Sequence, residues 1–196
     1  RHVISNADIE CIYQLPLVLE DQQFGDLLGE TLDLKTRLVE SNLYGEWVKT
    51  VNLFTQKYDT TIKIGMPGKY VDNKDSYVSI AEAISHACAH EGVNGEIVFI
   101  DAEEDGFEQS VLNCDGILLT PGFGTRGVEG MIASATVALE NKIPYLGICF
   151  GAQLFYVAFM RHVMKLKGAH STEINPECGE PVVSMMDEQK AKKSLG

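Results

Sequence analysis

The sequence lacks the features that mark membrane and secreted proteins. No apolar run approaches the roughly 20 residues that cross a bilayer, and the N-terminal residues lack the basic and then apolar pattern of a signal peptide. The five cysteines are odd in number and include no CxxC pair, which argues against a disulfide framework or a zinc knuckle. Cysteine usage of this kind favours a reducing compartment, so we expect a soluble, cytoplasmic protein with no membrane partner.

Positive charge is also scarce. The formal net charge is −12, with 16 lysine and arginine residues against 28 aspartate and glutamate residues. A protein that binds nucleic acid needs a basic surface against phosphate, and the sequence contains no concentrated basic segment. We therefore expect no nucleic-acid partner.

From about residue 62 onward, short apolar runs alternate with longer helix-like stretches. Strands that alternate with helices of about 10–15 residues indicate βαβ units. The sequence therefore predicts an α/β fold with a mostly parallel sheet flanked by helices. Strands are expected at 62–66, 97–100, 116–119, 144–148 and 182–185, and helices at 76–91, 128–141 and from 150 to about 167.

Residues 1–58 have a different pattern. Residues 9–24 are typical of a short amphipathic helix interrupted by Pro16, and residues 42–56 are typical of a second helix. We expect an N-terminal helical extension that leads into the α/β domain at residue 59. Because the chain begins with Arg1 rather than Met, we also expect it to be a piece of a longer protein.

The most informative stretch is residues 144–151, Pro-Tyr-Leu-Gly-Ile-Cys-Phe-Gly. A strand runs into Gly147, and a helix begins directly after Cys149. Small residues two places on either side of a nucleophile permit the sharp strand-to-helix turn of a nucleophile elbow. The helix N-terminus would stabilise the thiolate of Cys149. The alternative is an ordinary buried cysteine at the end of a strand.

A glycine-rich segment, residues 120–127, follows a different strand. Glycines let backbone N–H groups approach a ligand closely, and acyl transfer needs such donors for the oxyanion. The N–H groups of Gly122 and Phe150 are the natural pair, because Phe150 follows the nucleophile directly. Taken alone the segment could be only a turn, but ligands of α/β proteins bind at the carboxyl ends of the parallel strands, where both features lie.

Residues 147–153, Gly-Ile-Cys-Phe-Gly-Ala-Gln, match the GxCxGxQ signature of class I glutamine amidotransferases. Other stretches make the chain similar to one family of that class, the CTP synthases, in almost its whole length and in the order of motifs. These stretches are residues 5–22, 68–71, 75–79, 122–130 and 169–173. The resemblance implies a flavodoxin-like three-layer architecture. It also implies that residues 1–58 are the end of a synthetase domain with its linker, and that residues 59–196 are an amidotransferase domain whose C-terminal part is missing.

The resemblance also implies a reaction and its residues. Cys149 would attack the side-chain amide of L-glutamine while the N–H groups of Gly122 and Phe150 hold the oxyanion. Gln153 and Glu173 match positions that bind the charged groups of glutamine, and Gly122 contributes to the same pocket.

Two residues of the glycine-rich segment match a lid over the site. Phe123 would also bind glutamine, and Phe123 with Arg126 would meet the activator GTP. Pro121 stands where the family usually has glycine. Proline lacks an N–H group, but the donor that the oxyanion needs belongs to Gly122.

In the family, ammonia passes to a synthetase domain that aminates UTP to CTP with ATP and Mg²⁺. The resemblance therefore implies no cofactor in the amidotransferase domain itself. It implies a synthetase domain as partner and a homotetramer for the full protein.

The expected general base is absent. A thiol nucleophile needs a histidine within hydrogen-bond reach, and the HxE motif that supplies it in the family does not occur in this sequence. His162 lies 13 residues beyond Cys149, or about 20 Å along a helix, and nothing places His170 at the elbow. His86 and His90 suggest a metal site, but Cys88 points away from both at helical spacing, so we expect no metal.

Three functions therefore stay open. The first is a glutaminase domain completed by residues farther along a longer protein, this piece alone being inactive. The second is a catalytically incomplete module that binds glutamine or mediates assembly of a larger synthetase. The third is another class I amidotransferase with a different ammonia acceptor, which the segments at 68–71 and 122–127 argue against.

Overall fold

The computed structural model describes residues 3–34, 42–68 and 74–186. The chain divides into two compact units, one of residues Arg1–Thr60 with Ala83–Asn94 and one of residues Thr61–Glu82 with Gly95–Gly196. The domain boundary expected between residues 58 and 59 stays a prediction. Most of the motif at residues 68–71 lies outside the described residues.

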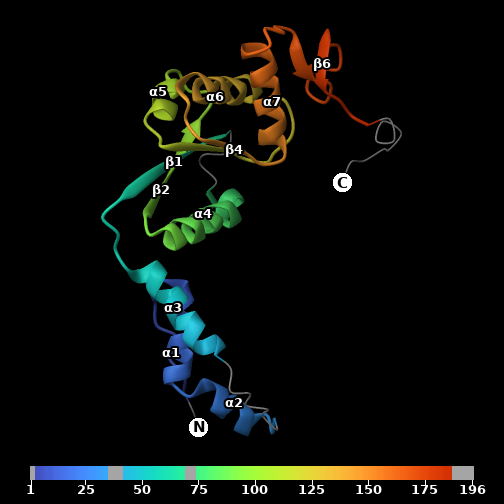
Figure 1. The fold of residues 1–196 in the computed structure, drawn as a ribbon. Coiled ribbons are helices and arrows are strands. Elements are labelled where there is room, and N and C mark those ends of the chain that lie inside the picture. The colour runs from blue at the N-terminus through green and yellow to red at the C-terminus, as the bar shows by residue number, and fades with distance from the viewer. Residues whose placement is uncertain (1–2, 35–41, 69–73, 187–196) are drawn as a thin grey trace. The chain divides into compact units, whose positions relative to one another are not determined.

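The second unit is built on a four-stranded sheet in the order β2-β1-β3-β4 (Figure 1). The strands are β1 (Thr61–Gly68), β2 (Asn94–Asp101), β3 (Gly116–Leu119) and β4 (Tyr145–Gly147). β3 runs parallel to both β1 and β4. The predicted α/β fold with a mostly parallel sheet is confirmed. β3 is buried along its whole length, as its unbroken apolar sequence requires.

Helices follow the strands in the expected alternation. They are α4 (Val78–Glu91), α5 (Phe107–Leu112), α6 (Val128–Asn141) and α7 (Phe150–His162), with a short 3₁₀ helix, η2, at Lys74–Tyr77. The bounds predicted for α6 are correct. The helix expected to reach about Lys167 ends instead at His162, and Lys165 takes a left-handed φ of 62°. A left-handed residue cannot continue a right-handed helix.

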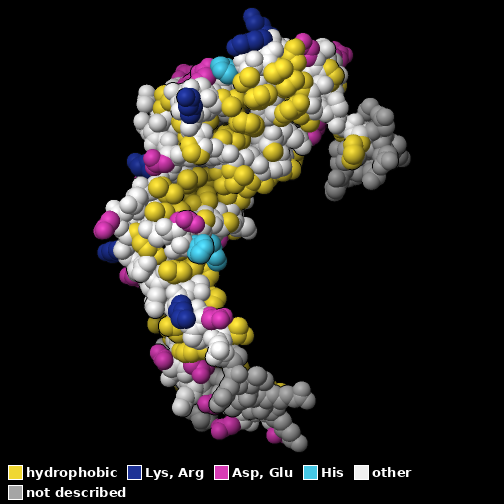
Figure 2. Space-filling view, in the orientation of Figure 1, with side chains coloured by type: hydrophobic (Ala, Val, Ile, Leu, Met, Phe, Trp, Pro, Cys, Tyr) yellow, Lys and Arg dark blue, Asp and Glu magenta, His cyan; other side chains and the backbone are white. Residues whose placement is uncertain are grey.

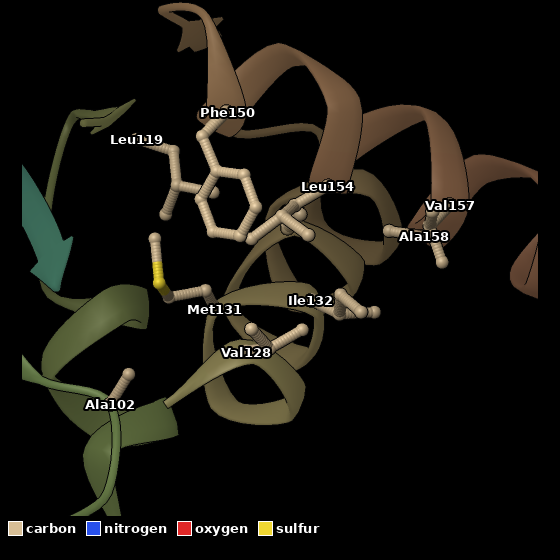
Figure 3. Packing of buried hydrophobic residues seen from close by; sticks show 10 residues of the cluster. Ala102, Leu119, Val128, Met131, Ile132, Phe150, Leu154, Val157 and Ala158 are labelled. Carbon is tan, nitrogen blue, oxygen red and sulfur yellow. The ribbon is translucent and has the colours of Figure 1, made fainter. Parts of the chain in front are cut away.

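The main core lies where α6 and α7 pack on the sheet (Figure 3). The ring of Phe150 points toward Leu119 and Met131, and Leu154 continues the contact along α7. Phe150, Leu119 and Leu154 are each no more than 2% exposed. Burial of these side chains fixes the first turn of α7 against the end of β3, which is the part of the fold that carries Cys149.

A separate two-stranded sheet follows α7. Its strands are β5 (Ala169–Ser171) and β6 (Glu180–Val183), and they run parallel. The predicted strand at residues 182–185 is thus real but begins and ends two residues earlier. The register of the pair shifts between His170 and Ser171, as in a β-bulge.

The first unit is helical. It contains η1 (Ile12–Gln14), α1 (Leu15–Asp21), α2 (Phe24–Thr31) and α3 (Leu43–Thr55). The prediction that Pro16 interrupts a helix is wrong, because Pro16 lies in the first turn of α1. Proline is tolerated there because the N–H groups of a first turn have no partner within the helix.

An aromatic cluster holds this unit together. Tyr13 packs on Phe54 with ring centroids 4.4 Å apart and forms a hydrogen bond of 2.6 Å with His86. Trp47 donates its ring N–H to the carbonyl of Tyr13. His86 is therefore used in packing.

The described residues include no helix long and apolar enough to cross a membrane. Lysine and arginine side chains stand singly or in small groups on the face shown in Figure 2, with acidic side chains among them. This distribution agrees with the scarcity of positive charge in the sequence.

Candidate active site

Cys149 lies between the end of β4 and the start of α7, with φ 53° and ψ −109°. A positive φ is uncommon for a residue with a side chain, and such strain clusters at functional sites. The thiol is exposed, unlike those of Cys88 and Cys114. The prediction that a helix begins directly after Cys149 is therefore correct, and this cysteine is not an ordinary buried one.

Both flanking glycines are required by close backbone contacts. A Cβ on Gly147 would lie 2.5 Å from the backbone nitrogen of Ala152. A Cβ on Gly151 would overlap the carbonyl oxygen of Leu119. The small residues of the motif thus let the chain reverse from β4 into α7 within one turn.

The first turn of α7 holds Cys149 in place by its backbone. The carbonyl of Cys149 accepts hydrogen bonds from the N–H groups of Ala152 and Gln153, at 3.1 and 3.2 Å. The thiol thus lies at the N-terminus of a 13-residue helix. The partial positive charge of a helix N-terminus stabilises an anion, and the thiolate is the reactive form of cysteine.

The glycine-rich segment after β3 contacts the elbow. A Cβ on Gly122 would lie 3.7 Å from the ring carbon Cδ1 of Phe150. Gly124 and Gly127 have φ of 84° and 69°, which glycine adopts without strain. The structure therefore brings Gly122 and Phe150 together, although they are 28 positions apart in the sequence (150 − 122).

The two residues matched to a lid lie on the surface. Phe123 is 78% exposed, an unusual position for a phenylalanine side chain. Arg126 donates from Nε to Oε2 of Glu103 at 2.8 Å, an ion pair with both side chains partly exposed. Glu103 was not identified from the sequence, since it lies on the loop after β2 and no motif marks it.

The two residues matched to glutamine binding have different surroundings. Gln153 follows Cys149 by four residues, and its N–H donates to the carbonyl of Cys149 at 3.2 Å. Its Oε1 is buried without a hydrogen-bond partner among the described residues. Such an atom costs free energy unless a ligand or water satisfies it. Glu173 is exposed, and its N–H donates to Oγ of Ser171 at 3.3 Å.

Two of the described histidines are paired with glutamates. Nδ1 of His162 lies 3.4 Å from Glu140, and Nε2 of His170 lies 3.2 Å from Glu129. Within the described residues no group of three histidine, cysteine or acidic side chains could hold a metal ion.

Sequence reasoning missed Tyr145, whose side chain contacts the first turn of α7. Its hydroxyl donates to the carbonyl of Gly151 at 3.0 Å, and its ring stacks on Phe155. Burial raises the pKa of Tyr145 well above its ordinary value of 10.0. A tyrosine two residues before the first glycine of the motif was the only available signal.

Comparison with known proteins agrees with this geometry. The family described as glutamine amidotransferase class-I matches residues 72–192. The chain belongs to this family.

Within the family, the chain is similar over its whole length to CTP synthases. It is 42% identical to the CTP synthase of Methanopyrus kandleri over 99% of this chain and 36% of the relative. It is also 42% identical to that of Saccharolobus solfataricus, over 100% of this chain and 37% of the relative. The chain thus spans little more than a third of these relatives.

A solved structure is similar as well. The glutaminase domain of Trypanosoma brucei CTPS with bound acivicin matches with a TM-score of 0.60 and 35% identity. The match covers 64% of this chain and 50% of that one.

Proposed function

We propose that the full protein hydrolyses glutamine at Cys149 of this chain to supply ammonia to its synthetase domain. The observation that carries the proposal is the exposed, strained Cys149 at the start of α7, between two glycines that backbone contacts require. A fold uses such strain where a side chain must be presented to a ligand.

The reaction follows from the thiolate. Its sulfur forms a bond to the amide carbon of glutamine, and the carbonyl oxygen becomes an oxyanion. The N–H groups of Gly122 and Phe150 are proposed to bind that oxyanion, which is supported by the contact between the two residues. The carbonyl then re-forms as the C–N bond breaks, and the nitrogen takes a proton from solvent water and leaves as ammonia. Water attacks the thioester, the C–S bond breaks, and glutamate and the thiolate are released.

The substrate glutamine is proposed to donate a hydrogen bond to Oε1 of Gln153. This buried oxygen has no partner in the described part of the chain, and the α-ammonium group of glutamine is a suitable donor. Glu173 is proposed to bind the same α-ammonium group by its charge. Its exposure leaves the carboxylate accessible to a ligand.

Phe123 and Arg126 are proposed to form a lid that also contacts glutamine and GTP. Arg126 is cationic and 66% exposed, which fits a phosphate group. The acidic Glu103 beside it would compete with such an anion. GTP binding at this position would therefore exchange one counter-ion of Arg126 for another.

For the full protein we propose ATP-dependent amination of UTP to CTP, in a cytoplasmic homotetramer. The proposal rests on similarity to CTP synthases along the whole chain. Residues 1–58 would then be the end of the synthetase domain and its linker. ATP and Mg²⁺ are assigned to that domain, and the described residues offer no metal site of their own.

A second candidate is a catalytically incomplete module that binds glutamine or mediates assembly. It is favoured by one observation, that His162 and His170 are paired with glutamates. A thiol without a histidine would accept glutamine and turn it over slowly or not at all.

The test is labelling with a glutamine-mimicking chloroketone, followed by peptide mass mapping. We expect Cys149 to be labelled faster than the other four cysteines, and glutamine to slow that labelling. Ammonia release from glutamine by the full protein separates the two candidates, because a binding module would be labelled and protected but would release none even there. If Cys149 remains unlabelled, both candidates fail at this site.

A further inference from the structure

Glu129 accepts hydrogen bonds from three nitrogen atoms of two other elements. The carboxylate lies in the first turn of α6, directly after the glycine-rich segment. Arg161, in the last turn of α7, donates from Nη1 at 2.6 Å and from Nη2 at 3.2 Å. His170, in β5, places Nε2 at 3.2 Å from Oε1. Bidentate pairing of this kind fixes both distance and orientation.

Arg161 has a further contact beyond the ion pair. Its Nε donates to the carbonyl of Ala169 at 2.8 Å, so all three guanidinium nitrogens are used. The arginine side chain is 23% exposed, and Ala169 is completely buried. One side chain therefore fixes the end of α7 to both the start of α6 and the start of β5.

A chain of hydrogen bonds continues from His170 to Glu173. Nδ1 of His170 accepts the N–H of Ser171 at 2.9 Å, so the proton of the neutral ring is on Nε2, facing Glu129. Oγ of Ser171 accepts the N–H of Glu173 at 3.3 Å. These contacts connect Glu129 to the backbone of Glu173 through the ring of His170 and through Ser171.

Burial and register both indicate that this chain of contacts is specific. The His170 side chain is 12% exposed, and Ser171 is 1% exposed. The register of the two-stranded sheet shifts between these two residues. A bulge re-aims side chains on the strand that it bends, and His170, which lies at this shift, faces Glu129.

We propose that Glu129, Arg161 and His170 are positioning residues for the site. They join the end of the glycine-rich segment, the end of α7 and the backbone of Glu173, so that Glu173 is held at a fixed distance from Cys149. None of the three touches the reacting atoms. The proposal rests on the proposed function, because it takes Glu173 as the residue that binds the α-ammonium group of glutamine.

The decisive variant is Glu129→Gln, which keeps the size of the side chain but removes its charge and one acceptor oxygen. The matched control is Glu140→Gln. Glu140 is also on α6 and also pairs with a residue at the end of α7, His162, but among the described residues no hydrogen bond links this pair to Glu173. Arg161→Lys is a third variant, which keeps the charge and loses the bidentate geometry.

Two reagents separate positioning from general damage. A glutamine-mimicking chloroketone carries an α-ammonium group, and iodoacetamide does not. For Glu129→Gln we expect the chloroketone concentration at half-maximal labelling rate to rise about tenfold, the change expected from one lost charge-assisted hydrogen bond. The maximal rate of labelling by the chloroketone should equal that of the wild-type chain. The rate at which iodoacetamide labels Cys149 should also equal that of the wild-type chain.

A second measurement does not depend on glutamine. Hydrogen exchange at the amide of Glu173 reports directly on its hydrogen bond to Ser171. We expect exchange across residues 169–173 to be faster in Glu129→Gln and unchanged in Glu140→Gln.

Unchanged exchange in Glu129→Gln would overturn the positioning role, whatever the chloroketone shows. So would an equal response of Glu140→Gln, or a parallel fall of the iodoacetamide rate. A failure of the proposed function is distinct from these outcomes. In that case the unchanged chain would show no preference for the chloroketone over iodoacetamide and no protection by glutamine, while the exchange result would still decide the positioning role.

Discussion

The α-carbon of Gly151 lies against the carbonyl group of Leu119, with no room for a methyl group between them. The same carbonyl accepts the N–H of Ile148 at 3.0 Å. One backbone oxygen at the end of β3 thus contacts the chain on both sides of Cys149. The position of the thiol is set by this contact between neighbouring parallel strands and the first turn of α7.

Replacing Gly151 by alanine should therefore destabilise the protein. The added methyl group meets backbone atoms, which cannot rotate away, and we expect a loss of about 3 kcal/mol in the free energy of unfolding. Urea unfolding measures this loss. Gly45→Ala is the control, because Gly45 lies in helix α3 with open space around it. Alanine there should leave stability unchanged or raise it by up to about 1 kcal/mol. Equal effects at the two positions would contradict the close contact.

Cys149→Gly should be more stable than Cys149→Ala. Both variants lose the thiol, but only glycine adopts φ 53° with ψ −109° without strain. We expect a difference of about 1–2 kcal/mol in urea unfolding, the usual cost of one strained residue. Both variants should lose chloroketone labelling at this position. If alanine is as stable as glycine, the elbow is not strained.

Tyr145→Phe should cost about 1 kcal/mol at neutral pH, because the carbonyl of Gly151 loses a buried donor. The pKa of Tyr145 is raised by burial. A raised pKa means that the tyrosine contributes its stability below its ordinary value of 10.0 and loses it as the pH rises above that value. The advantage over phenylalanine should shrink in urea unfolding above about pH 10. A constant difference across that range would argue against a buried hydroxyl.

Glu129 should stabilise the protein at neutral pH and not in acid. The hydrogen bond from Arg161 is the main cause that holds the pKa of this carboxyl below its ordinary value of 4.5, with smaller contributions from the charge of Arg161 and the hydrogen bond from His170. A lowered pKa gives stability that is complete above the ordinary value and disappears as the pH falls through the lower one. The stability difference between the unchanged chain and Glu129→Gln should therefore fall as the pH drops from about 5 to about 3. Urea unfolding at a series of pH values tests this expectation. Glu140→Gln, whose partner is a histidine and not an arginine, should show a smaller change.

Elements with a long or clearly bounded pattern were predictable from the sequence. The bounds of β3 and α6 are correct to the residue, because β3 is one unbroken apolar run and α6 begins after Gly127 and ends before Lys142, each with a left-handed φ. The helix α5 was missed, since its six residues are too few for a helical period to be visible. The end of α7 was placed too late because the sequence beyond His162 contains no glycine or proline before Gly168.

The residues of the candidate site also divide into those that the sequence predicts and those that it does not. A local motif identified Cys149 and its two glycines, because the strand-to-helix turn is a property of seven consecutive residues. No local pattern identified Glu103, Tyr145 or the partners of Glu129. The contacts of Glu103 and Glu129 join residues far apart in the sequence, and many pairings would satisfy the same charges equally well. Tyr145 contacts Gly151, only six residues away, but no motif marks its hydroxyl.

The sequence by itself determined the α/β class of the fold and the family to which the chain belongs, and it predicted Cys149 as the nucleophile. The fold class and the family follow from residue types, spacings and the order of motifs along the chain, and the predicted nucleophile follows from one motif, so no contact between distant residues has to be known. Only the tertiary structure showed the contact of Leu119 with Gly151 and the connection of Glu129 to Glu173. It also showed that Oε1 of Gln153 is buried with no partner among the described residues. Such contacts are fixed by how α6, α7 and β5 pack, and packing depends on the shape of the whole unit rather than on any one segment.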